Sequence, residues 1–92
     1  MDTQTLRFTF EPPADPGTVE EDFGLALFVA SCIYGRPSVR LAARHLVSPD
    51  GRRCVATLAG SVGEAVLRVF TGLCASRVGE QGFRIERIEA AR

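Results

Sequence analysis

The chain has 92 residues, of which 46% are hydrophobic and 24% charged, and its eleven basic and eleven acidic side chains leave no formal net charge. This length and composition predict one globular domain that buries its own core, and they exclude a disordered segment. A neutral chain has no bulk attraction for nucleic acid or for an anionic membrane. We therefore expect neither as a partner.

The three cysteines, Cys32, Cys54 and Cys74, are widely spaced, and no two have the CxxC spacing of a metal or redox site. Such a set is typical of reduced thiols in the core, so we expect a cytoplasmic protein without a metal or other cofactor. The first ten residues alternate and have no apolar core of a targeting segment. The uncharged run Phe23–Tyr34 has twelve residues, which predicts a buried helix because a membrane span needs about twenty.

A strand followed by a helix is predicted at the start of the chain. Thr5–Glu11 alternates in polarity, as a half-buried strand does, and Thr18–Glu21 has the spacing of a capping box that opens a helix ending at Gly35. The expected core stripe of this helix is Val19, Phe23, Ala26, Leu27, Ala30 and Ile33. Leu25, Phe28 and Val29 lie largely outside this stripe, and a helix that is apolar on more than one side suggests an oligomer contact.

A β-hairpin is predicted over Val39–Ala59, with its turn at Ser48–Gly51. Pro49 presets the φ angle for a type I turn, and Gly51 adopts the left-handed conformation that follows. With a three-residue loop, the strand pairs would be Ser48 with Arg52, Leu46 with Cys54, Arg44 with Ala56 and Ala42 with Leu58. This register decides which side chains face the core.

The expected register divides the hairpin between a core face and an open face. The core face would carry Val39, Leu41, Ala43, His45, Val47, Val55, Thr57 and Ala59. The open face would carry Arg7, Thr9, Arg40, Ala42, Arg44, Leu46, Cys54, Ala56, Leu58 and Arg84. Because apolar residues ringed by Arg favour docking over a merely solvated sheet face, the predicted interface is Arg7, Arg40, Arg44, Leu46, Cys54 and Leu58.

The second half of the chain repeats the pattern of strand, helix and strand. Ser61–Glu64 has the spacing of a second capping box, opening a helix to about Arg77, and Phe83–Glu89 is a last strand. Right-handed crossovers then place the first and third strands side by side. The predicted fold is α+β, a ferredoxin-like split βαβ arrangement in which two helices cover one face of a four-stranded antiparallel sheet.

Catalytic chemistry has little support in the sequence. His45 is the only histidine and is expected in the core, while Cys54 is expected on the other face, so no Cys–His pair forms. No ligand spacing predicts a metal site, and we predict no catalytic residue. RNA binding through the sheet needs stacking aromatic side chains at the positions of Thr9 and Ala56. Neither residue is aromatic, so the sequence disfavours RNA binding.

These observations favour a non-catalytic module that acts by self-association as a homodimer, or as an accessory subunit that binds a protein partner. The alternative is a regulatory domain that binds an amino acid or another small anion, near Ser61 and Gly63 or beside Arg36 and Arg40. Residues 36–53 hold five Arg against one Asp, and residues 1–22 hold six acids against one Arg. This asymmetry fits either the orientation of subunits or the attraction of an anion.

Overall fold

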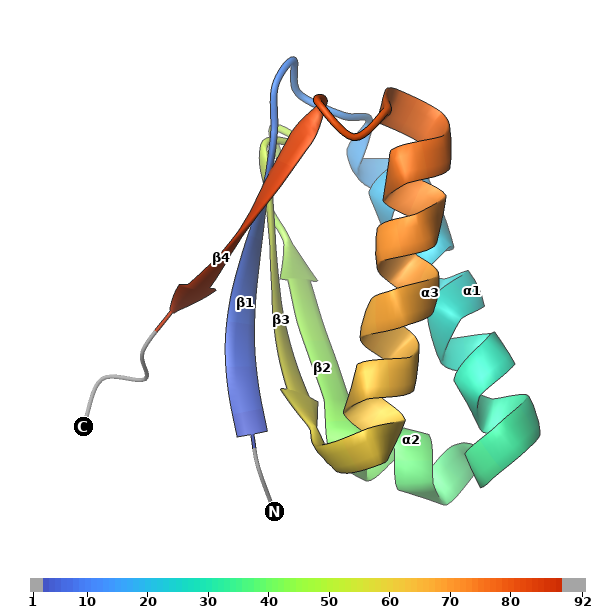
Figure 1. The fold of residues 1–92 in the computed structure, drawn as a ribbon. Helices are drawn as coiled ribbons and strands as arrows, with labels where there is room; N and C mark the ends of the chain where they lie inside the picture. The colour runs from blue at the N-terminus through green and yellow to red at the C-terminus, as the bar shows by residue number, and fades with distance from the viewer. Residues whose placement is uncertain (1–2, 89–92) are drawn as a thin grey trace.

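The fold is an antiparallel sheet covered on one face by helices, in a computed structural model that describes residues 3–88 (Figure 1). The elements are β1 (Thr3–Phe10), α1 (Pro16–Tyr34), α2 (Arg36–Ala42), β2 (Ala43–Val47), β3 (Arg53–Ala59), α3 (Gly60–Val78) and β4 (Phe83–Ile88). The strand order is β2-β3-β1-β4, with β1 and β3 in the centre. The predicted ferredoxin-like arrangement is confirmed, and the short helix α2 is an addition to it.

The core lies between the sheet and the two long helices. Leu6, Phe8 and Phe10 alternate along β1 and are buried, as their spacing predicts. Phe70 of α3 packs edge-on against both Phe8 of β1 and Phe23 of α1, with ring centroids 4.9 Å apart in each case. These three rings join the sheet to both helices.

Both predicted capping boxes are wrong, because each helix begins earlier than its box. The carboxylate of Asp15 accepts a hydrogen bond from the amide of Thr18 at 3.1 Å, and a proline in the first turn starts α1. Helix α3 follows β3 directly and has no side-chain cap. Glu64 instead pairs with Arg68 at 2.9 Å, four residues along the helix, as expected.

The beginning of the predicted hairpin is a helix and not a strand. Gly35 ends α1 with a φ of 88°, and a proline in the first turn then starts α2. Val39 and Ala42 are three residues apart, so in a helix they share the buried side, whereas Leu41 is 87% exposed. The core assignment of Leu41 and the placing of Arg40 and Ala42 on the open sheet face are therefore wrong.

The hairpin register also differs by one residue from the prediction. The amide of Ser48 donates to the carbonyl of Arg53 at 2.9 Å, so the loop has four residues, 49–52, and not three. The pairs are Val47 with Cys54, His45 with Ala56 and Ala43 with Leu58. Cys54, Ala56 and Leu58, which we predicted on the open face, therefore face the core. Val55, Thr57 and Ala59, which we predicted in the core, lie on the open face.

The longer loop is held by its own side chains. Asp50 accepts hydrogen bonds from the Ser48 hydroxyl at 2.7 Å and from the Arg52 amide at 3.0 Å, and these bonds lower the pKa of the Asp50 carboxyl. The Ser48 hydroxyl in turn accepts from the amide of Arg53 at 3.0 Å. This network accommodates one more residue than the turn pattern alone predicts.

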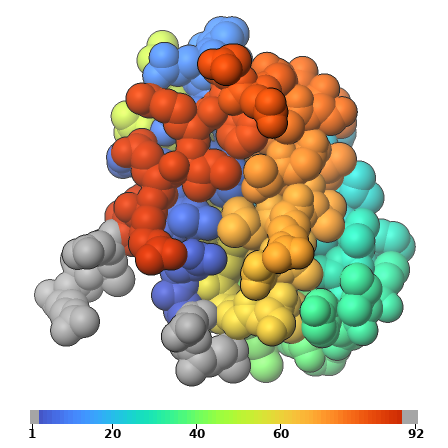
Figure 2. Space-filling model, in the orientation of Figure 1, coloured from blue at the N-terminus to red at the C-terminus, as the bar shows by residue number. Residues whose placement is uncertain are grey.

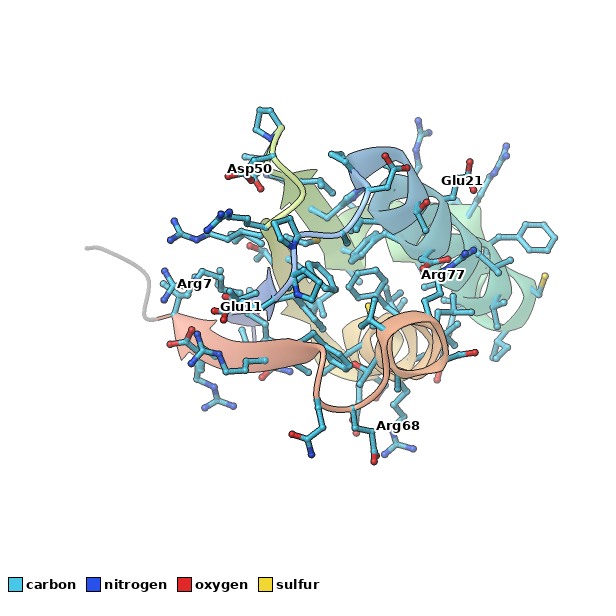
Figure 3. The ribbon with its side chains drawn as sticks, turned by 90° about the horizontal axis from the view of Figure 1, so that it is seen from above. Arg7, Glu11, Glu21, Asp50, Arg68 and Arg77 are labelled. Atoms are coloured by element: carbon cyan, nitrogen blue, oxygen red, sulfur yellow. The ribbon has the colours of Figure 1, made fainter. Side chains whose placement is uncertain are left out.

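One ion pair with a buried carboxylate and a half-exposed guanidinium joins α1 to α3. The Asp22 side chain is 6% exposed, and its carboxylate lies 2.8 Å from Nε of Arg77, which points from α3 toward α1 (Figure 3).

Ile33, which we expected on the buried side of α1, is 69% exposed near the end of the helix. None of the helices in residues 3–88 is long and apolar enough to cross a membrane.

Replacing Arg77 by Leu is expected to lower the free energy of unfolding by about 1–3 kcal/mol, because the buried Asp22 carboxylate loses its cationic partner. Urea unfolding measures the change. The double variant Asp22→Leu with Arg77→Leu should recover most of the loss, since no charge then remains buried. Equal losses in the single and double variants would contradict this account of the pair.

Candidate interaction surface

The open face of the sheet is mostly polar. Arg7 of β1 lies 3.4 Å from Glu86 of β4, and the hydroxyls of Thr5 and Thr57 are 3.3 Å apart. Arg7, Arg44 and Leu46 are on this face as predicted, and Leu46 is 74% exposed. Because Cys54, Ala56 and Leu58 are in the core, the apolar centre of the predicted sheet interface does not exist.

Exposed apolar side chains gather instead on α1. Of the eight large hydrophobic side chains exposed in residues 3–88, four belong to α1, namely Leu25, Phe28, Ile33 and Tyr34. Phe28 is 64% exposed and Leu25 is 47% exposed, as expected from their place outside the core stripe, while Val29 is half-buried. In the space-filling view, α1 lies at the edge of the molecule with its outer side uncovered (Figure 2).

The α1 outer face is defined here by five exposed residues that recur at helical spacing, namely Glu21, Gly24, Leu25, Phe28 and Cys32. Sequence reasoning named Leu25 and Phe28 but overlooked Glu21 and Gly24. The signal was present, because residues seven apart lie on one side of a helix and Glu21 precedes Phe28 by seven. The buried side of α1 points the opposite way and carries Val19, Phe23, Ala26 and Ala30.

A groove of about 870 Å³ runs beside this face, between α1 and α2. Its lining is Gly24, Leu27, Phe28, Ser31, Cys32, Arg36, Val39, Arg40 and Ala43. Arg36 and Arg40 are four residues apart on α2, and neither forms an ion pair with a carboxylate of residues 3–88. The groove thus combines an apolar wall with two cations that no described carboxylate neutralises.

The two places that were predicted as alternatives for an anion are separate in the structure. Arg36 and Arg40 line the groove, and Ser61 and Gly63 do not. Gly63 is buried where α3 crosses β3, and a Cβ added there would lie 2.9 Å from the carbonyl carbon of Leu58. Gly63 therefore serves helix–strand packing.

His45 and Cys54 share the core face, which corrects the prediction that they lie on opposite faces. The His45 ring stacks on Phe23 with centroids 4.1 Å apart, and its Nε2 atom lies 3.1 Å from Oε2 of Glu20. Burial, and less strongly the charge of Glu20, raises the pKa of the Cys54 thiol to about 12. Burial likewise raises the pKa of Cys74 to about 12. Neither thiol is a nucleophile at neutral pH, because the nucleophile is the thiolate.

Titratable side chains do not converge into a metal site in the part of the chain that the structure describes. Within residues 3–88, no three His, Cys, Asp or Glu side chains lie close enough together to hold a metal ion.

Thiol labelling is expected to distinguish the three cysteines. Cys32 is exposed on α1, whereas Cys54 and Cys74 are buried and protonated. In a solution dilute enough to keep the chain monomeric, a chromogenic disulfide reagent at neutral pH should therefore modify one thiol per folded chain rapidly, and all three after denaturation. A Cys32→Ser variant should show no rapid phase. Rapid labelling of that variant would contradict the burial of the other two thiols.

The stability of the protein is expected to fall in alkaline solution. Below about pH 9 the Cys54 thiol is protonated in both states, whereas between about pH 9 and 12 only the unfolded chain releases the proton. Rising pH then favours unfolding, by up to about 1.4 kcal/mol per pH unit for this thiol. Thermal melts in this range check the slope, which should be shallower in a Cys54→Ala variant. An unchanged slope in that variant would contradict the assignment to Cys54.

The fold and this surface define the class of the protein, a small α+β module with a ferredoxin-like strand order and an uncovered apolar helix. Comparisons with protein-family models, with curated proteins and with solved structures found no match to the chain. A functional assignment therefore has to come from the geometry of the chain itself.

Proposed function

We propose that the protein acts by association, binding a protein partner on the α1 outer face and the adjoining groove, and that it has no catalytic role of its own. The observation that carries this proposal is Phe28, a phenylalanine 64% exposed on an uncharged stretch of helix and lining a groove beside two arginines. Aromatic and Arg side chains are enriched where binding energy concentrates in protein interfaces.

The physical basis is the burial of apolar surface together with the neutralisation of charge. Leu25 and Phe28 would leave water on docking, which contributes a gross gain of about 25 cal/mol per Å² of apolar surface buried, against the entropic cost of association. Arg36 and Arg40 at the groove provide fixed charges that select an acidic group on the partner. The protonated state of the buried Cys54 thiol supports a non-catalytic role.

Site-specific photocrosslinking in cells that encode the protein tests this proposal. A photoreactive amino acid at Phe28 is expected to give a discrete protein adduct, which mass spectrometry identifies together with the crosslinked residue. The matched control is the same amino acid at Leu46, which is exposed on the sheet face. Adducts that are equally abundant at both residues, or absent at Phe28, would refute a docking site on α1.

A second candidate function is favoured by the groove itself. Arg36 and Arg40 beside Leu27 and Val39 would suit a small organic anion with an apolar part. A carboxylate-bearing metabolite that binds only the folded chain must raise the melting temperature. That rise should disappear in the Arg36→Gln, Arg40→Gln double variant. No stabilisation by any carboxylate across a metabolite panel would exclude this function.

A further inference from the structure

The acidic residues near the start of α1 differ in their partners. Asp22 pairs with Arg77, and Glu20 contacts His45. Glu21 forms no ion pair with any basic residue among residues 3–88, and it points to the solvent side of α1 (Figure 3). The α1 outer face therefore carries one free carboxylate at its beginning.

The opposite charge stands at the other end of the same surface. Arg36 begins α2 just beyond the end of α1, and it lines the groove together with Phe28 and Cys32. Along α1, which rises 1.5 Å per residue, Glu21 precedes Phe28 by about 10 Å, and the helix ends at Tyr34 about 9 Å after Phe28, just before Arg36. Glu21 and Arg36 therefore lie toward opposite ends of α1, with Phe28 between them.

A surface with this layout is complementary to itself. In a two-fold dimer, each contact between residue i and residue j occurs twice, so a patch with an apolar centre and opposite charges at its two ends can pair with a copy of itself in reverse. With the axis at Phe28, Glu21 of one copy faces Arg36 of the other. The apolar residues meet in the middle, where water is most completely excluded.

Gly24 permits the close approach that such a pairing requires. A Cβ added to Gly24 would meet nothing within 4 Å in the single chain, so this glycine is not needed for packing within it. In the antiparallel pairing, Gly24 lies four residues before the axis and Cys32 four residues after it, so the two face each other across the interface. A missing side chain at that point lets two helices pack at the shorter end of the usual 8–10 Å.

We propose that the partner bound by the α1 outer face is a second copy of this chain, with the two α1 helices antiparallel about a two-fold axis at Phe28 and Glu21 paired with Arg36 of the other copy. This inference rests on the proposed function and names its partner. Glu21, Phe28 and Arg36 meet in one self-complementary surface, and the open face of the sheet is not part of this interface.

Sedimentation equilibrium of the purified chain at micromolar concentration tests the dimer. The unaltered chain is expected to have twice the monomer mass. Phe28→Glu should raise the dissociation constant at least about 30-fold, as expected for loss of a central aromatic residue. Leu46→Glu is the matched control, since it places the same charge on an exposed leucine of the sheet face, and it should remain dimeric. Far-UV circular dichroism establishes that each variant is folded.

The charge pairing has a separate test. Glu21→Arg and Arg36→Glu should each weaken the dimer, because like charges then face each other, whereas the double variant should restore it. Gly24→Gln should keep the single chain folded while weakening the dimer. A double variant that fails to recover would overturn the Glu21–Arg36 pairing.

A monomeric unaltered chain, or a dimer disrupted by Leu46→Glu and not by Phe28→Glu, would overturn the two-fold dimer on α1. If the chain is monomeric while the photocrosslinker at Phe28 captures a different identified protein, the second copy is the wrong occupant and the proposed function still stands. If neither experiment finds a partner on α1, both proposals fail.

Discussion

A Leu58→Glu variant is expected not to fold. Leu58 is 2% exposed and lies beneath α3, where the backbone at Leu58 is in close contact with Gly63. The substitution removes a buried apolar side chain and places a carboxylate in the hydrophobic core, at a cost of more than about 4 kcal/mol. Small domains lie toward the lower end of the usual range of about 5–15 kcal/mol, so a loss of this size removes most of the stability. Circular dichroism and urea unfolding measure the effect.

The control for this prediction is Leu46→Glu, because Leu46 is on the neighbouring strand and 74% exposed. Its free energy of unfolding should change by no more than about 0.5 kcal/mol. The pair of variants reports directly on the hairpin register. In the three-residue loop expected from the turn pattern, both leucines would be on the open face and both variants would fold, which is the result that contradicts the observed register.

A Gly51→Ala variant is expected to lose about 2–4 kcal/mol of stability. Gly51 has a φ of 71°, which side chains with a Cβ rarely adopt. A Cβ at this residue would also overlap the carbonyl oxygen of Ala14, and the amide of Ala14 donates to the Gly51 carbonyl at 2.9 Å. The substitution therefore pushes the hairpin loop away from the segment that precedes α1. Urea unfolding measures the loss.

Gly79→Ala separates the two causes. Gly79 has a φ of 76°, and a Cβ added there meets nothing within 4 Å, so this variant carries the backbone strain without the overlap. It should cost only about 1 kcal/mol. Equal losses at Gly51 and Gly79 would mean that the contact between the hairpin loop and Ala14 contributes nothing to stability.

The candidate site was predictable in the part that depends on helical periodicity. Leu25 and Phe28 fall outside the buried stripe of α1 whatever the helix packs on, because the core can cover only one side of a helix at the edge of a molecule. The groove was not predictable, because it exists only once α2 is seen to be a helix. The alternation of Val39, Leu41 and Ala43 resembles a strand, and the proline after Gly35 fits either a helix end or a new helix start.

The order of the four strands and two long helices and the ferredoxin-like arrangement followed from local patterns, because strand alternation, helical spacing and right-handed crossovers act over short stretches of the chain. The register of the hairpin depended on tertiary structure. Alternation with a period of two shows that the two faces of a strand differ. It does not show which face is buried, because one more residue in the loop moves every side chain of the paired strand to the other face. Here a four-residue loop is stabilised by the side-chain hydrogen bonds of Ser48 and Asp50 and by the hydrogen bond from the Ala14 amide to the Gly51 carbonyl. That single residue buries Cys54 and Leu58 and leaves the open sheet face polar, whereas the outer side of α1 is uncovered in either register.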